Sequence, residues 1–186
     1  MSNILKKLYN QKSKDLLVKK LESEDFNRTT CSFYKYVTII DPQILRDRIY
    51  EEFDNIDILG RVYIAEEGIN AQISVPDKNR GLFLKLISNI KLLNGADIKT
   101  AINDGISFYK LVVKVKKEIV AYNIPKNKFN MDVVGEHLNT KQFNEAMENT
   151  NTTVIDMRNI YESEVGQFIS AEIPQVEKSK DLLPEV

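Results

Sequence analysis

The sequence has one cysteine, Cys31, one histidine, His137, and no tryptophan among its 186 residues. A single cysteine excludes an internal disulfide, a CxxC redox pair and a zinc site built from several cysteines, and a single histidine excludes a His-rich metal centre. No uncharged apolar run approaches the roughly 18 residues that a membrane span requires, and no apolar segment typical of a signal peptide follows the lysine-rich start. We therefore expect a reduced, cytoplasmic protein without a metal or a membrane partner.

The composition is that of an ordinary globular protein, with 42% hydrophobic and 28% charged residues, and the length allows one large or two small domains. The formal net charge of −1 conceals a segregation of charge. Residues 1–20 and 109–128 each carry six lysines and one acidic residue, whereas residues 132–186 carry eleven acidic and four basic residues. A basic surface favours a polyanionic partner, although lysine clusters are also common on solvated faces.

The first half of the chain predicts alternating strands and helices. Residues 1–27 predict a helical segment, most clearly from the N-cap candidate Ser13 onward. Residues 31–40 are rich in aromatic and β-branched side chains and predict a strand, after which Asp41-Pro42 has the order of an N-cap and a first helical residue. The helix that follows ends before Gly60. Its expected buried stripe consists of Leu45, Ile49, Phe53 and Ile56.

A hairpin and a second helix are expected next. Residues 61–65 and 69–75 predict two strands, and Gly68 between them suggests a tight connection with an unusual backbone angle. Asp77 is the expected cap of the second helix. A short extended piece at 97–102 and a longer strand at 108–115 complete the pattern. The apolar side of the second helix is expected to comprise Leu82, Phe83, Leu86, Ile87 and Ile90.

This β-α-β-β-α-β order predicts an α+β, ferredoxin-like fold, with two helices on one face of an antiparallel sheet and the 108–115 run as its last strand. We expect this domain to span 28–122 and a linker to occupy 123–135. In 136–186, Asn139-Thr140 predicts the start of a helix and 152–157 a strand, while 171–174 is too short and too close to a proline to supply a partner strand. Because the apolar strand is typical of a sheet covered on both faces, this segment is expected to be an incomplete α/β domain.

Three separated strings carry a family resemblance. They are SFYKYV (32–37) with GRVYIAEEGINAQISV (60–75), VKVKKEIV (113–120) and VIDMRNIYESEVGQF (154–168). Over residues 28–170 the chain resembles the rhodanese-like tRNA uridine hydroxylases. The resemblance implies an acylphosphatase-like (ferredoxin-type) domain followed by a rhodanese-like domain. It also implies that the anticodon loop of tRNA is the partner, and that molecular oxygen is the co-substrate for 5-hydroxylation of the wobble uridine, with no cofactor in this chain.

The same resemblance places the reactive cysteine in a C-x-x-G-x-R loop, and the sequence contains no such string. The family pattern puts that loop beyond Val186, and Cys31 matches no catalytic position. We therefore expect a chain truncated before the catalytic loop, with no catalytic residue of its own and no activity alone. Self-association through the incomplete second domain stays open.

Lysines of the last strand are the expected contacts to RNA. Lys110, Lys114 and Lys116 share one strand face, with Lys117 close by, and would hold phosphates without reading sequence. The alternative is that they protect a sheet edge from aggregation. Tyr34 and Tyr36 alternate in the first strand and could stack on bases, but burial under the helices is the favoured interpretation.

Other candidate residues are expected to support the fold. Glu67, Gly68 and Asn70 lie where two strands meet, and we expect them to serve turn geometry and local hydrogen bonding. Asp156 and Arg158 follow the second domain's strand, where α/β folds place ligands, but are expected to tie a loop to the sheet. His137 lacks a second candidate metal ligand, and no role is assigned to it or to Cys31.

Two other functions stay open. The first domain could be an RNA-binding or protein-interaction module without catalysis. The chain could also be a relative of the rhodanese sulfurtransferases, whose domains carry persulfide sulfur.

Overall fold

The computed structural model of the chain describes residues 8–101, 107–120, 124, 128, 130, 133–177 and 179–182. The chain divides into two compact units, one ending at Ile119 and the other beginning at Val120. Much of the expected linker at 123–135, and the start of the expected N-terminal helical segment at 1–7, lie outside the described residues.

The first unit is built on a five-stranded mixed sheet with the strand order β4-β1-β3-β2-β5. Strand β1 pairs antiparallel with β3 and β4, β2 pairs antiparallel with β3, and β5 runs parallel to β2. The four strands from β4 to β2 thus have the ferredoxin-like arrangement, and β5 extends it at one edge. The strands are β1 (Arg28–Tyr36), β2 (Leu59–Ala65), β3 (Gly68–Pro76), β4 (Lys99–Thr100) and β5 (Leu111–Val115).

The place of the last strand corrects the sequence prediction. The 108–115 run is predicted as the last strand of an antiparallel ferredoxin-like sheet, a strand that in this fold pairs with the first one, but β5 lies at the opposite edge, parallel to β2. The two-residue β4, within the extended piece predicted at 97–102, takes the place beside β1. The sequence misleads because β5 buries Leu111 and Val113 and so has a strong strand pattern, whereas both residues of β4 are exposed. Pairing partners are not encoded by the local pattern.

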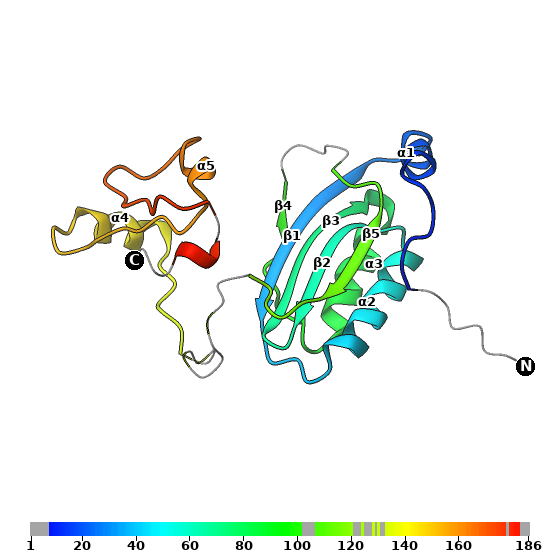
Figure 1. Cartoon of the computed structure of the whole chain (residues 1–186), viewed down its shortest axis with the longest axis horizontal. Helices are drawn as coiled ribbons and strands as arrows, with labels where there is room; N and C mark the ends of the chain where they lie inside the picture. The colour runs from blue at the N-terminus through cyan, green and yellow to red at the C-terminus, as the bar shows by residue number, and fades with distance from the viewer. Residues whose placement is uncertain are drawn as a thin grey trace, which may run out of the picture. The chain divides into compact units, whose positions relative to one another are not determined.

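Two helices, α2 (Pro42–Asn55) and α3 (Arg80–Asn89), cover one face of this sheet (Figure 1). Helix α2 starts as predicted, because an Asp41 carboxylate oxygen accepts hydrogen bonds from the amides of Gln43 and Ile44, each 3.0 Å long. Between the layers, the Phe83 ring lies 6.4 Å from Phe33 and 6.0 Å from Phe53. The fully buried core also includes Ile39, Ile49, Ile58, Val62, Ile64, Ile69, Ile73, Val75 and Leu93.

Helix α1 (Lys14–Glu22) begins at the predicted cap, where Ser13 Oγ accepts a hydrogen bond from the Leu16 amide. Leu21 is buried, but Leu16 is 59% exposed, so the expected apolar face is only partly used. An almost fully buried ion pair of 2.6 Å joins Glu24, just after the helix, to Arg28 at the start of β1. This pair fixes the entry of the chain into the sheet.

The start of α3 differs from the prediction. Asp77 does not cap the helix but opens a 3-10 turn, η1 (Asp77–Asn79), and its carboxylate accepts a hydrogen bond of 2.6 Å from the Thr29 hydroxyl. Because this partner on β1 engages the carboxylate, the helix begins three residues later, at Arg80. Leu82, predicted on the apolar side, is 55% exposed, while Phe83 is buried.

The connection between β2 and β3 requires a glycine at position 68. Gly68 has a φ of +151°, and a Cβ placed there would lie 2.1 Å from the carbonyl oxygen of Lys35. The residues before it hold the chain that leaves β1, since the Glu67 carbonyl accepts from the Val37 amide at 3.0 Å and the Glu66 carbonyl from the Ile39 amide at 2.8 Å. The hairpin is therefore locked against the end of β1.

The second unit contains α4 (Thr140–Glu148), α5 (Ile160–Ser163) and the short turn η3 (Ser179–Asp181). Helix α4 begins as predicted, with a capping box formed by Asn139 and Gln142. The predicted strand at 152–157 is reduced to a parallel bridge between Ile155 and Glu172. Residues 171–174, predicted to be unable to pair, thus supply the partner. They can do so because Glu172 supplies both hydrogen bonds of the bridge: its amide donates to the Val154 carbonyl at 2.8 Å, and its carbonyl accepts from the Asp156 amide at 2.9 Å. Pro174, which has no amide hydrogen, lies beyond the bridge.

An ion pair between Asp156 and Arg158 ties this unit together. The buried carboxylate of Asp156 accepts from Arg158 Nε at 2.9 Å and Nη2 at 2.6 Å, and from the Ser163 hydroxyl at 3.0 Å. Arg158 Nη2 also donates to the Gly166 carbonyl at 2.7 Å. Hydrogen bonds from Arg158 hold the pKa of Asp156 well below its usual range, against the opposing effect of burial. The pair therefore links the bridge, α5 and the loop that follows α5.

We expect Gly68→Ala to lower the free energy of unfolding of the first unit by about 3 kcal/mol, because the added methyl group must displace the Lys35 carbonyl or strain the hairpin. The matched control is Gly81→Ala in α3, where no heavy atom lies within 4 Å of the added Cβ. That variant should be unchanged or more stable by up to about 1 kcal/mol. Urea unfolding followed by hydrogen exchange of β2 and β3 amides measures both, and equal stabilities of the two variants would contradict the strain at Gly68.

Replacing Asp156 with asparagine should destabilise the second unit in a pH-dependent way. Because the folded pKa of Asp156 is lowered, the carboxylate stabilises the fold fully above the ordinary aspartate pKa of about 4, and this contribution is lost as the pH falls below that value. The stability difference between the wild type and Asp156→Asn should thus be largest near pH 7 and shrink below about pH 4. Urea titrations at a series of pH values, read from NMR signals of the second unit, provide the measurement. A difference that does not change with pH would show that the charge of Asp156 contributes nothing.

Candidate nucleic-acid interface

The face of the sheet opposite α2 and α3, termed the open face, carries polar, aromatic and basic side chains. Neighbouring residues of a strand point to opposite faces, so the buried Phe33 and Val62 assign Tyr34 and Tyr63 to the open face. Residues paired across strands share a face. One row across β1, β3, β2 and β5 therefore consists of Tyr34, Asn70, Tyr63 and Lys114, and the next row, which starts on β4, of Lys99, Ser32, Gln72, Arg61 and Val112.

Two of the predicted lysines lie together on this face. Lys114 is exposed and pairs with Tyr63, and the ammonium of Lys116 lies 5.3 Å from the centre of the Tyr63 ring. Lys117 is exposed beyond the end of β5. Lys110, one residue before β5, lies apart from this pair, with its ammonium 5.5 Å from the Tyr109 ring.

The open face lacks negative charge on its strands. None of the five strands contains an aspartate or a glutamate, and Arg61 and Lys99 add exposed cations to Lys114 of β5. The ammonium of Lys99 lies 3.8 Å from the carboxylate of Asp97, just before β4, so Arg61 is the stronger addition. Neither Arg61, Lys99 nor Tyr63 is selected by the sequence analysis. The alternation of Arg61 and Tyr63 with the apolar Val62 is a signal that could have found Arg61 and Tyr63, once the buried face was known. The near-neutral charge of the whole chain does not describe this surface.

Tyr34 and Tyr36 point away from the helices, contrary to the favoured sequence interpretation. They are 63% and 46% exposed, and their rings meet edge to face with centres 6.4 Å apart. Phe33, between Ser32 and Tyr34 in the same strand, takes the buried position under the helices. The aromatic run supplies both faces because each strand face receives every second residue.

Glu67 and Asn70 hold the segment that follows β5. The Ile119 amide donates to a carboxylate oxygen of Glu67 at 2.7 Å, and the Asn70 side-chain amide donates to the Ile119 carbonyl at 3.4 Å. Ile119 is itself buried. With the Lys116 amide bonded to the Ile64 carbonyl at 2.8 Å, residues 116–119 are fixed beside the hairpin. These two side chains thus position the chain that carries Lys116 and Lys117.

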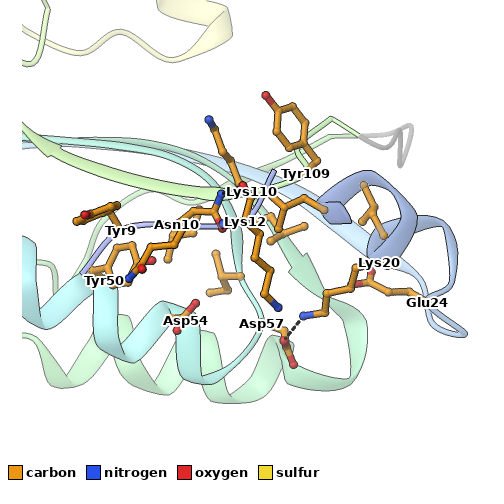
Figure 2. A pocket seen from close by; sticks show the side chains of 16 residues that line it. Tyr9, Asn10, Lys12, Lys20, Glu24, Tyr50, Asp54, Asp57, Tyr109 and Lys110 are labelled. Carbon is orange, nitrogen blue, oxygen red and sulfur yellow. Dashed lines mark hydrogen bonds and ion pairs between the residues drawn. The ribbon is translucent and has the colours of Figure 1, made fainter. Parts of the chain in front are cut away.

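A pocket of about 300 Å³ lies between residues 9–12, α1, α2 and the start of β5 (Figure 2). Its charges are mixed. Lys20 forms an ion pair with Asp57, drawn as a dashed line in Figure 2, with an N···O distance of 3.5 Å, and Glu24 is paired with Arg28. Burial, assisted by the charge of Asp54, raises the pKa of Tyr50 in its wall. The residues that line the pocket include three cations, Lys12, Lys20 and Lys110, and three carboxylates, Glu24, Asp54 and Asp57. The balance of charge makes this pocket a weaker anion site than the open face.

The remaining candidates do not form a second site. Asp156 and Arg158 use their polar groups within the second unit, Cys31 is buried in the core of the first unit, and His137 is exposed. Within the described ranges, no three His, Cys, Asp or Glu side chains are grouped as metal ligands would be. No helix in the described part of the chain has the length and apolarity needed to cross a membrane.

Comparison with known proteins agrees with the division of the chain into two units, one ending at Ile119. Residues 28–119 match the family described as the UPF0176 acylphosphatase like domain. A protein named tRNA uridine(34) hydroxylase from Leptospira interrogans is 44% identical over 177 residues, which cover 95% of this chain and 48% of that protein. Proteins with the same name are 42% identical over 96% of the chain in Citrobacter koseri and 45% identical over 90% of it in Escherichia coli O17:K52:H18, covering 53% and 49% of those proteins.

The chain spans about half the length of the curated relatives it matches. The similarity extends through both units, because the matched segments cover 90% or more of the chain, whereas the domain match coincides with the first unit. The chain is homologous over 90% or more of its length to proteins named tRNA uridine(34) hydroxylase, and its first unit is a UPF0176 acylphosphatase like domain.

Proposed function

We propose that the chain takes part in 5-hydroxylation of the wobble uridine of tRNA in the cytoplasm, with molecular oxygen as co-substrate, and that its first unit holds the tRNA. The names of the relatives support the reaction. The observation that carries the assignment of the first unit is its open face, where Arg61, Lys99, Lys114 and Lys116 lie on or beside strands without a single carboxylate. Such a face attracts a phosphate backbone and releases its counterions.

Within this proposal the lysines have graded roles. Lys114 and Lys116 contact the backbone of the anticodon arm directly, because both lie at the open face beside Tyr63. Lys117 and Lys110 flank them, one after the strand and one at the rim of the pocket. Glu67, Gly68 and Asn70 act through the backbone by fixing the hairpin and residues 116–119.

The second unit is proposed to be part of a rhodanese-like α/β domain. The parallel bridge at Ile155 and the ion pair of Asp156 with Arg158 are features that such a domain can share. Ile155 and Phe168 beside them are 37% and 52% exposed, which leaves an apolar surface for further protein or for a second copy of the chain. No catalytic role falls to Cys31, because its thiol lies in the core, 2% exposed, away from any substrate.

Neutralising the lysines tests the role of the open face. We expect the triple variant Lys110→Gln, Lys114→Gln, Lys116→Gln to weaken tRNA binding and to reduce the slope of log K against log salt by about 2, the value for three lost phosphate contacts. A control with the same loss of charge, Lys85→Gln, Lys91→Gln, Lys141→Gln, removes exposed lysines from α3, the residues after it and α4. Filter binding or fluorescence anisotropy between 50 and 200 mM salt gives both slopes. Equal slopes for the two triple variants would reject the proposed surface.

The reaction itself is tested on tRNA from a strain that lacks the gene. Mass spectrometry of the wobble nucleosides should show loss of the 5-hydroxyuridine group, with thiolated nucleosides unchanged. The gene carrying the substitutions of Lys110, Lys114 and Lys116 should restore the nucleoside less well than the gene carrying the control substitutions. Loss of thiolated nucleosides with normal hydroxylation would instead identify a sulfurtransferase.

A further inference from the structure

We propose that the tyrosines of the open face bind unpaired bases, so that the first unit is a single-strand RNA module and not a general polyanion-binding surface. This inference rests on the proposed function in taking RNA as the ligand. It assigns Tyr34 and Tyr36 to base stacking and Lys114, Lys116 and Arg61 to the phosphates. The chemical class that fits is a short unpaired RNA segment, such as a loop.

The tyrosine pair has the exposure that stacking needs. Tyr34 is 63% and Tyr36 46% exposed, and both are on the face opposite the buried Phe33. Their rings meet edge to face at an interplanar angle of 74°, so the contact involves one face of one ring and leaves the other ring faces free of it. An exposed aromatic face gains free energy when a base stacks on it, whatever the base.

The distance between Tyr34 and Lys114 matches the length of a short stretch of RNA strand. Tyr34 and Lys114 occupy the two ends of one row, separated by Asn70 and Tyr63 on the two intervening strands. With strands spaced about 4.8 Å apart, the row is about 14 Å long, which is the span of about two or three nucleotides. A base at Tyr34 can therefore be joined to a phosphate at Lys114 by a short stretch of the same strand.

The charge of the surface selects the occupant. No strand carries a carboxylate, and both rows carry cations. The face therefore complements a polyanion and is unsuited to a basic or an apolar protein partner. A duplex would leave the tyrosines unused, since its base faces are already covered by stacking. An unpaired strand uses both features, the aromatic rings and the cations.

The experiment measures binding of the full chain to a uridine-rich 8-mer RNA and to an RNA duplex of similar charge. We expect the double variant Tyr34→Ala, Tyr36→Ala to bind the 8-mer at least tenfold more weakly, with an unchanged salt slope, and to bind the duplex like the wild type. The variant Tyr34→Phe, Tyr36→Phe keeps the rings and should bind the 8-mer like the wild type. A further control, Tyr161→Ala, removes a 58% exposed tyrosine from the second unit and should also have no effect.

Each result has a defined meaning. Wild-type affinity of the double alanine variant for the 8-mer overturns the inference, as does an equal loss of affinity for 8-mer and duplex. Hydrogen exchange of the β1 and β3 amides shows whether the variants are folded, and the phenylalanine variant keeps the inference testable if the alanine variant is not. In that case a tenfold weaker binding of the 8-mer by the phenylalanine variant overturns it. Failure here leaves the 5-hydroxyuridine measurement unaffected, so the inference and the proposed function fall separately.

Discussion

Burial of one face of the five-stranded sheet under α2 and α3 is the constraint on which the rest of the first unit depends. Phe33, Val62 and Ile73 can all reach the helices only in one register of β1, β2 and β3, because a slip of one residue would turn each of them to the other side. The composition of the open face follows from this register. Tyr34, Tyr63 and Lys114 are aligned because their neighbours are buried, and no contact among the three is needed to align them.

The hairpin at Gly68 transmits this order to the end of β5. Its close approach to Lys35 holds the hairpin against β1, and Glu67 and Asn70 on either side of it then hold the backbone of Ile119. The backbone between β5 and Ile119 has little freedom left, because the Lys116 amide also bonds to β2. A long lysine side chain on a fixed backbone loses less entropy on binding a phosphate than one on a mobile loop does.

Local patterns predicted the elements of the first unit better than their partners. The Asp41-Pro42 cap, the alternation in 69–75 and the special backbone at Gly68 are written in neighbouring residues, and the structure confirms them. The exchange of β4 and β5 could not be predicted in this way, since a two-residue exposed strand has no hydrophobic period and the choice of edge depends on contacts with α2. The prediction that Asp77 caps the second helix is wrong for the same reason, because the hydrogen-bond partner of Asp77 is Thr29, 48 residues away in the sequence.

The candidate site shows where sequence reasoning reaches its limit. Clustered charge predicts Lys114 and Lys116 because lysine density is visible without a fold. Arg61 and Tyr63 on β2 and Lys99 on β4 join the same face only through strand pairing. The prediction for the tyrosines is wrong because one face of the strand buries aromatic side chains under the helices, and the aromatic run by itself does not say which residues belong to that face. The alternation of side chains along the strand decides their side. Cys31 and Phe33 are buried at odd-numbered positions, so Tyr34 and Tyr36, at even-numbered positions, lie on the opposite face. A single buried phenylalanine thus determines that two tyrosines and two lysines face the same way.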